Sequence, residues 1–165
     1  QKLNVPFDSP IATGQNIKMF KQIKELATKT SMELAEERGE APDMGGTGMR
    51  NAHLLAIAPN ATSSIICGGT SPSIEPIRAN VFIHKTLNGS FQVRNRQLHN
   101  LLKQKWENSE ELQKEYDTDY QSFKDKVWQS ISEHNGSVKH LEFLSDLERD
   151  VFKSSTHTRK RLGCI

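Results

Sequence analysis

The apolar run from Leu54 to Ala58 constrains the fold of this chain more than any other feature of its sequence. An unbroken run, without the alternation of a half-exposed strand, is typical of a strand that is covered on both faces, as in a parallel sheet. Pro59 follows it and lacks the amide hydrogen that a sheet ladder needs, so the strand should end there. The run therefore predicts a buried strand that ends in a turn.

The turn after this strand is rich in hydroxyl groups. Asn60, Thr62, Ser63 and Ser64 are residue types that cap helices or close turns by bonding to nearby backbone groups. If a short helix begins there, its first amides are unpaired and carry the positive end of the helix dipole, so amides and hydroxyls together could hold a phosphate. Capping alone is the simpler alternative, because such turns commonly do nothing else.

A long amphipathic helix is predicted before the strand, over about residues 16–38, with a loop over residues 1–13 leading to it. Its apolar stripe recurs at spacings of three and four and consists of Phe20, Ile23, Ala27, Thr30 and Leu34. Gly39 suits a left-handed conformation just after the helix.

A β-hairpin is predicted beyond the turn. Asn88 and Gly89 separate two strand-like runs, residues 80–86 and 91–94, and Asn-Gly between such runs is a strong hairpin signal.

Several amphipathic helices should follow the hairpin. The first ones are expected near Leu98, Leu112 and Tyr120. Ser137 can cap a last one, whose stripe would be Val138, Leu141, Leu144, Leu147 and Val151. Together these elements indicate a mixed α/β fold.

Composition limits the classes of function. The net charge of +2 is too small to indicate binding to nucleic acid or to an anionic membrane. No apolar stretch approaches the roughly 20 residues of a membrane span, and no signal peptide is recognised at the start. The two cysteines cannot form a disulfide framework, which favours a reducing compartment. We therefore expect a cytoplasmic protein.

Metal and thiol chemistry are not indicated either. The six histidines show neither His-x-x-x-His nor Cys-x-x-Cys spacing, so no metal site is predicted. Cys67 lies close to the hydroxyl-rich turn, but a small buried thiol is the simpler interpretation. No catalytic residue is predicted in this chain.

Several motifs, in the same order, resemble the large (catalytic) subunit of aerobic, class I ribonucleotide reductase. The first group comprises residues 33–39 (ELAEERG), 48–52 (GMRNA), 56–64 (AIAPNATSS) and 68–76 (GGTSPSIEP). The second comprises residues 80–86 (NVFIHKT), 89–95 (GSFQVRN), 136–138 (GSV), 140–145 (HLEFLS) and 151–154 (VFKS). The resemblance implies an incomplete section of that family's ten-stranded α/β barrel over residues 1–155. Residues 156–165 form a basic tail unrelated to the family, as an interrupted gene would produce.

The resemblance also gives the turn a specific role. In that family a Pro-x-x-Thr-Ser turn holds the diphosphate of the ribonucleotide substrate, which implies the same for Pro59, Asn60, Ala61, Thr62 and Ser63. Thr62 and Ser63 would donate hydroxyl and backbone hydrogen bonds. Asn60 and Ala61 would contribute mainly backbone amides and shape. The family's radical cysteine and its disulfide-forming pair belong to other regions, so no catalytic role passes to this chain.

The resemblance implies partners as well. Such an enzyme reduces ribonucleoside diphosphates to deoxyribonucleoside diphosphates for DNA synthesis, and it depends on a metal-radical small subunit and on thioredoxin or glutaredoxin as reductant. No cofactor is expected in this chain, which should be inert alone. Three hypotheses stay open: a piece of a split large subunit that acts with the remaining segments, an inactive remnant of an interrupted gene, and a stand-alone nucleotide-phosphate binding module.

Overall fold

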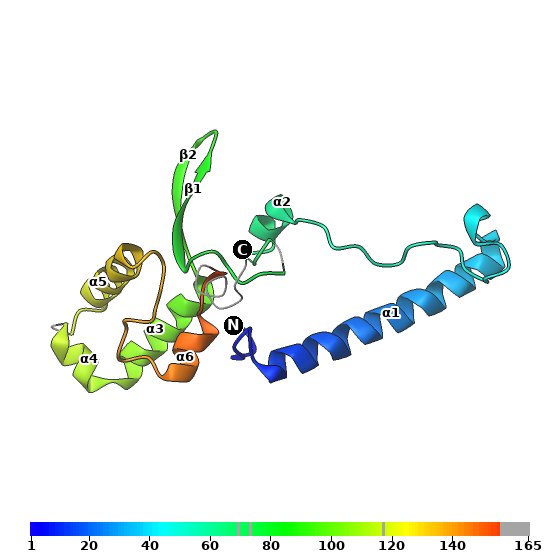
Figure 1. Ribbon diagram of the computed structural model, residues 1–165. Helices are drawn as coiled ribbons and strands as arrows, with labels where there is room; N and C mark the ends of the chain where they lie inside the picture. The colour runs from blue at the N-terminus through cyan, green and yellow to red at the C-terminus, as the bar shows by residue number, and fades with distance from the viewer. Residues whose placement is uncertain (69, 73, 117, 156–165) are drawn as a thin grey trace, which may run out of the picture. The chain divides into compact units, whose positions relative to one another are not determined.

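The computed structural model describes residues 1–155 except residues 69, 73 and 117 (Figure 1). The basic tail predicted over residues 156–165 lies outside the described residues. The chain divides into two compact units, one formed by Asp8–Pro59 and the other by Gln1–Phe7 together with Asn60–Ile165.

The long helix α1, Pro10–Arg38, dominates the unit of residues 8–59. It confirms the helix predicted over residues 16–38 but begins earlier. The reason is local: the side chain of Ser9 accepts a hydrogen bond from the amide of Ala12 at 3.2 Å, and Pro10 suits the first helical position. Gly39 follows with a φ of 79°, in the region that favours glycine, as predicted.

The chain after α1 folds back along this helix. A single 3-10 turn, η1, covers Pro42–Met44. The backbone carbonyl of Ser31 on α1 accepts from the amide of Arg50 at 3.1 Å, and its hydroxyl accepts from the amide of Asn51 at 3.0 Å. These bonds account for the burial of Ser31, which is 2% exposed.

The predicted buried strand over Leu54–Ala58 is wrong for this structure. These residues form no regular element, and Ile57 is 76% exposed. A strand of this kind needs neighbouring strands to pair its backbone and layers to cover its faces. Within the described part of the chain, the only sheet is formed by two other strands, so the apolar run lacks the sheet that its composition suits.

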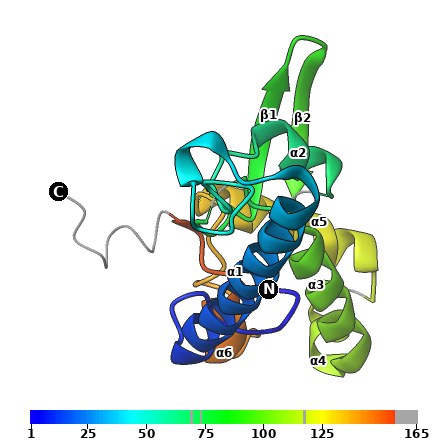
Figure 2. The same ribbon diagram turned by 90° about the vertical axis from the view of Figure 1, so that its right-hand side faces the viewer.

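The second unit begins with helix α2, Ala61–Ile66, and continues to the predicted hairpin. Strands β1, Val81–Thr86, and β2, Gly89–Arg94, pair antiparallel with Val81 opposite Arg94 and Thr86 opposite Gly89. The hairpin is confirmed, and Figure 2 shows its loop end projecting away from the helices of the same unit.

The remaining helices are α3 (Arg96–Asn108), α4 (Glu110–Glu115), α5 (Tyr120–Glu133) and α6 (Asp146–Val151). Each begins with a side-chain cap, from Asn95, Ser109, Asp119 and Ser145 respectively. No helix among the described residues is long and apolar enough to cross a membrane.

Phe123 lies at the centre of the core of this unit and is 0% exposed. Its ring centroid is 4.9 Å from that of Trp106, 5.2 Å from that of Tyr116 and 6.0 Å from that of Phe143. Aliphatic side chains from three helices surround this aromatic cluster, among them Leu98, Leu102, Val127, Ile131 and Val151.

The last helix is shorter than predicted. Residues 138–144 form successive turns, in which the amide of Leu141 donates to the carbonyl of Val138 at 3.1 Å and that of Leu144 to the carbonyl of Leu141 at 3.2 Å. These turns bury one residue in three, so they reproduce the spacing from which a helix was predicted. Of the predicted stripe only Leu147 is largely exposed, at 52%.

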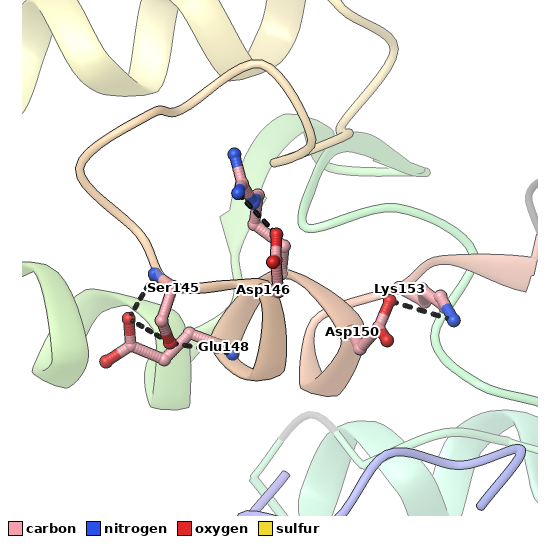
Figure 3. A network of polar contacts seen from close by, with 6 residues as sticks. Ser145, Asp146, Glu148, Asp150 and Lys153 are labelled. Atoms are coloured by element: carbon pink, nitrogen blue, oxygen red, sulfur yellow. Dashed lines mark hydrogen bonds and ion pairs between the residues drawn. The ribbon is translucent and has the colours of Figure 1, made fainter.

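Helix α6 begins only at Asp146 because Ser145 and Glu148 form a capping box there. The backbone amide of Ser145 donates to the Glu148 carboxylate at 2.8 Å, and the hydroxyl of Ser145 accepts from the amide of Glu148 at 3.3 Å (Figure 3). At the other end, Asp150 pairs with Lys153 at 2.9 Å. The polar contacts of α6 therefore define both of its ends.

Candidate functional site

The hydroxyl-rich turn forms the start of α2, as the sequence suggested. Asn60 is its N-cap residue, but the Asn60 side chain makes no capping hydrogen bond. Its backbone instead ties the turn together: the amide of Asn60 donates to the carbonyl of Pro72 at 2.9 Å, and its carbonyl accepts from the amide of Ser64 at 2.9 Å. The loop after α2 therefore returns to the start of the helix.

Ser64 holds this turn from the inside. It is 6% exposed, and its hydroxyl donates to the carbonyl of Ala61 at 2.9 Å. Its own carbonyl accepts from the amide of Thr70 at 3.2 Å. Ser64 thus acts in the way that the simpler, structural interpretation of a hydroxyl-rich turn expects.

Thr62 and Ser63 differ from Ser64. Both are exposed, and neither hydroxyl has a hydrogen-bond partner within the described part of the chain. The first amides of any helix also lack an intrahelical acceptor, and here they belong to Ala61, Thr62 and Ser63. The turn therefore presents two hydroxyl groups and the first helical amides to solvent on adjacent residues.

Any attraction of this turn for an anion comes from its backbone and hydroxyl groups and not from charged side chains. Residues 60–66 contain neither lysine nor arginine. Since α2 has six residues, its dipole is small, and an anion would be held mainly by direct hydrogen bonds from amides and hydroxyls. Pro59, the remaining residue of the predicted motif, is exposed and is the last residue of the other unit.

Cys67 follows α2 directly and is exposed, so the expectation of a buried thiol is wrong. Helix α2 buries only Ser64, and its two isoleucines, Ile65 and Ile66, are exposed as well.

The residues described contain no group of three His, Cys, Asp or Glu side chains that could hold a metal ion.

The sequence analysis missed a buried polar cluster that anchors the segment leading from the turn to the hairpin. The side-chain amide of Asn80 donates to the carbonyls of Gly136 at 3.0 Å and Phe152 at 2.8 Å. Its oxygen accepts from the side-chain amide of Asn95 at 2.8 Å. We refer to Asn80, Asn95, Gly136 and Phe152 as the Asn80 clamp.

A signal for this clamp was present in the sequence. Asn80 and Asn95 flank the two strands of the hairpin, and antiparallel pairing brings such positions together. Gly136 carries a second constraint: its φ is 78°, and an added Cβ atom would lie 2.4 Å from the Cβ of Ala79. The clamp thus requires both a particular amide side chain and a glycine.

Comparison with known proteins places this geometry in a family. The family model described as "Ribonucleotide reductase, barrel domain" matches residues 42–162. The large subunit of ribonucleoside-diphosphate reductase from Invertebrate iridescent virus 3 is 45% identical over 139 residues, which cover 84% of this chain and 20% of that protein.

Two further similarities agree with this match. A putative large subunit of the same enzyme from Frog virus 3 is 40% identical over 162 residues, covering 98% of this chain and 26% of that protein. Among solved structures, the alpha subunit of the class Id ribonucleotide reductase of Actinobacillus ureae superposes with a TM-score of 0.70 at 37% identity, covering 93% of this chain and 25% of that one. The chain spans about a fifth to a quarter of the length of these proteins.

Proposed function

Because the chain belongs to the ribonucleotide reductase family and matches its barrel domain, we propose that it forms part of a ribonucleoside-diphosphate reductase large subunit and supplies the substrate-diphosphate turn. The turn consists of Pro59, Asn60, Ala61, Thr62 and Ser63. The observation that carries this proposal is the exposure of the Thr62 and Ser63 hydroxyls, which have no partner among the described residues, beside a Ser64 whose hydroxyl bonds to Ala61.

The proposed contacts follow from the types of donor in the turn. A diphosphate has only acceptor oxygens at neutral pH, and the turn offers groups that can donate to them: the first amides of α2 and two hydroxyl groups. Ser64 and the bond between Asn60 and Pro72 hold these donors in place before a ligand arrives. Such preorganisation lowers the entropic cost of binding.

The reduction itself requires groups outside the described residues. In the assembled enzyme, ribonucleoside diphosphates would be reduced to deoxyribonucleoside diphosphates with a metal-radical small subunit and a thioredoxin or glutaredoxin reductant. The residues of the turn would bind and orient the substrate.

The exposed apolar surface supports assembly with the remaining large-subunit segments. Ile57 and Leu55, in the apolar run, are 76% and 47% exposed, and Ile17 on α1 is 62% exposed. A monomeric protein seldom exposes so many large apolar side chains unless another polypeptide covers them. A remnant of an interrupted gene and a stand-alone phosphate-binding module are the alternatives.

Ligand binding to the isolated chain tests the role of the turn. Titration with CDP and with pyrophosphate, followed by NMR, should shift the amide signals of Ala61, Thr62 and Ser63. The double variant with Thr62→Ala and Ser63→Ala should lose this response, whereas Ser90→Ala, at an exposed hydroxyl in the hairpin, should keep it. Equal binding by both variants would exclude the two hydroxyls as diphosphate donors, and unchanged amide signals in the parent chain would exclude the turn as the site.

A pull-down from native cells tests the assembly. The tagged chain should recover the remaining large-subunit segments and a small subunit, and the eluate should reduce CDP. Ile57→Asp, which places a charge in the exposed apolar run, should release these partners, whereas Leu87→Asp at the fully exposed hairpin loop should not. A folded chain that binds CDP without partners would favour the stand-alone module, and an unfolded one the remnant.

A further inference from the structure

A stacked pair of histidines joins the end of α5 to the turns that follow it. The rings of His134 and His140 lie with their centroids 3.7 Å apart and their planes at 13°. Both rings also contact Ser130 on α5. The Nδ1 atom of His134 is 2.8 Å from the carbonyl oxygen of Ser130, and the Nε2 atom of His140 is 2.8 Å from its hydroxyl. We call these three residues the histidine latch.

The hydrogen bonds of the latch suit neutral rings. The Nδ1 atom of His140 is buried and has no partner within the described part of the chain. In the neutral ring that donates from Nε2 to Ser130, this atom is a lone pair, which is cheap to leave unpaired. Protonation converts it into a buried N–H donor without an acceptor, which is costly.

The charge of His134 acts in the same direction. Burial, and then the charge of His134, lower the pKa of His140. The neighbouring charged residues are Glu133 on α5, whose carboxylate accepts from the side-chain amide of Gln129 at 3.0 Å, and Lys139 and Glu142 on the segment of His140 itself. No carboxylate among the described residues counteracts the lowering of this pKa.

The latch closes a segment that covers the core. Residues 138–144 contribute Val138, Leu141 and Leu144, which are 1%, 6% and 1% exposed. Gly136, immediately before this segment, accepts hydrogen bonds from the backbone amide of Asn80 at 3.1 Å and from its side chain at 3.0 Å. Opening of the latch would therefore loosen the cover of the core and the Asn80 clamp together.

A catalytic role for Ser130 and His140 is not supported by the geometry. A serine hydroxyl beside an imidazole resembles a nucleophile with its base, but the base then needs a third group that orients its other nitrogen. In His140 that nitrogen has no partner among the described residues. Ser130 and His140 therefore have a structural role.

We propose that the histidine latch is an acid-sensitive closure, which holds residues 138–144 over the core at neutral pH and opens when the ring of His140 becomes protonated. The sign follows from the lowered pKa of His140: the unfolded chain takes up the proton more readily than the folded one. The stabilisation is complete above the ordinary histidine pKa of 6.5 and is lost as the pH falls below that value.

Amide hydrogen exchange of the full chain, measured by NMR between pH 7.5 and 5 and corrected for the intrinsic rate, tests this proposal. Exchange at Leu141 and Leu144 should rise several-fold on acidification, while that at Val127 in the middle of α5 should not. His140→Gln keeps a side chain that can bond to Ser130 but cannot titrate, so it should abolish the rise. His84→Gln, on β1, is the matched control and should leave the rise unchanged.

Two outcomes would overturn the proposal. One is a His140 signal that titrates like that of an ordinary histidine; the other is an equal rise at Val127, which would mean global unfolding. The pKa of His99 on α3 is also lowered, by burial and by Lys124. Any effect of His99 on the pH dependence is the same in the parent and in both variants, so it does not affect their comparison. A third variant, His134→Gln, should reduce the rise because it removes one cause of the lowered pKa of His140.

Discussion

The two units of this chain carry similar apolar patterns but bury them to very different extents. In the second unit Leu98, Phe123 and Ile131 are each 0% exposed. In the first, Phe20 and Ile23 belong to the predicted stripe of α1 and are 46% and 40% exposed. An amphipathic stripe therefore predicts that a helix forms, whereas its burial depends on a partner that only the second unit contains within the described residues.

Two matched phenylalanine substitutions, one in each unit, should show the largest difference in their effect on stability. Phe123→Ala removes a ring that four other aromatic rings contact, and it should lower the free energy of unfolding by about 3–5 kcal/mol. Phe20→Ala removes the same group from a half-exposed site and should change the free energy of unfolding by less than about 0.5 kcal/mol. Urea denaturation followed by tryptophan fluorescence measures the first effect and circular dichroism the second. Similar losses for the two variants would contradict the comparison.

The Asn80 clamp should give the next largest effect. Asn80→Ala removes three buried hydrogen bonds, to the carbonyls of Gly136 and Phe152 and from the side-chain amide of Asn95, so it should cost about 3 kcal/mol. Asn88→Ala, in the hairpin loop, is the control and should leave the stability unchanged. The measurement is the midpoint of thermal unfolding. An Asn80→Ala protein as stable as the control would show that the clamp does not hold the second unit together.

The ion pair between Glu148 and Lys105 should give a smaller, pH-dependent effect. Burial raises the pKa of Glu148, but the hydrogen bonds from Lys105 and Ser145 outweigh it, so the pKa is lowered overall. The resulting stability is present above pH 4.5, the ordinary pKa of this group, and is lost as the pH falls below it. Glu148→Gln should cost about 1 kcal/mol at pH 7 and progressively less as the pH falls below 4.5.

The control for this effect is an exposed pair. The Nζ atom of Lys114 lies 3.9 Å from Oε2 of Glu110, and the two side chains are 77% and 89% exposed, so Glu110→Gln should not change stability measurably. Chemical denaturation at several pH values compares the two variants. A loss in Glu148→Gln that does not depend on pH would mean that the carboxylate charge is not its cause.

The N-cap of α1 should give the smallest effect, in the unit that has least internal packing. Ser9→Ala removes the acceptor for the amide of Ala12 and should destabilise the first turn by about 0.5–1 kcal/mol. Hydrogen exchange at the amides of Ala12 and Thr13 should rise, and Ser9→Asp, which also caps helices well, should restore protection. If exchange is already fast in the parent, then the first turn of α1 is not held by its cap.

Local signals predicted most of the secondary structure. The spacing of apolar residues identified α1 and α5, and Asn88-Gly89 identified the hairpin. Each of these patterns acts over a few residues, so the sequence contains it in full. The same kind of signal misled at residues 138–144, because successive turns and a helix both bury every third or fourth residue.

At the candidate site, too, local features could be predicted from the sequence and long-range contacts could not. The sequence identified the turn and its hydroxyl residues, and the family resemblance assigned them to a substrate diphosphate. It did not distinguish Ser64, which is buried and bonded to Ala61, from Thr62 and Ser63, which are exposed. That distinction depends on which face of α2 meets the returning loop at Pro72, and this is a long-range contact.

Most of the helices, the hairpin, the position of the turn and the family could be predicted from the sequence, because these depend on local spacing and on motif identity. The tertiary structure alone decided which apolar runs are buried, which hydroxyl of the turn is used in the fold, and that Asn80 joins four segments. The physical reason is that burial and hydrogen-bond satisfaction are properties of pairs of segments. Leu54–Ala58 has the composition of a buried strand, and without neighbouring strands it remains an exposed loop.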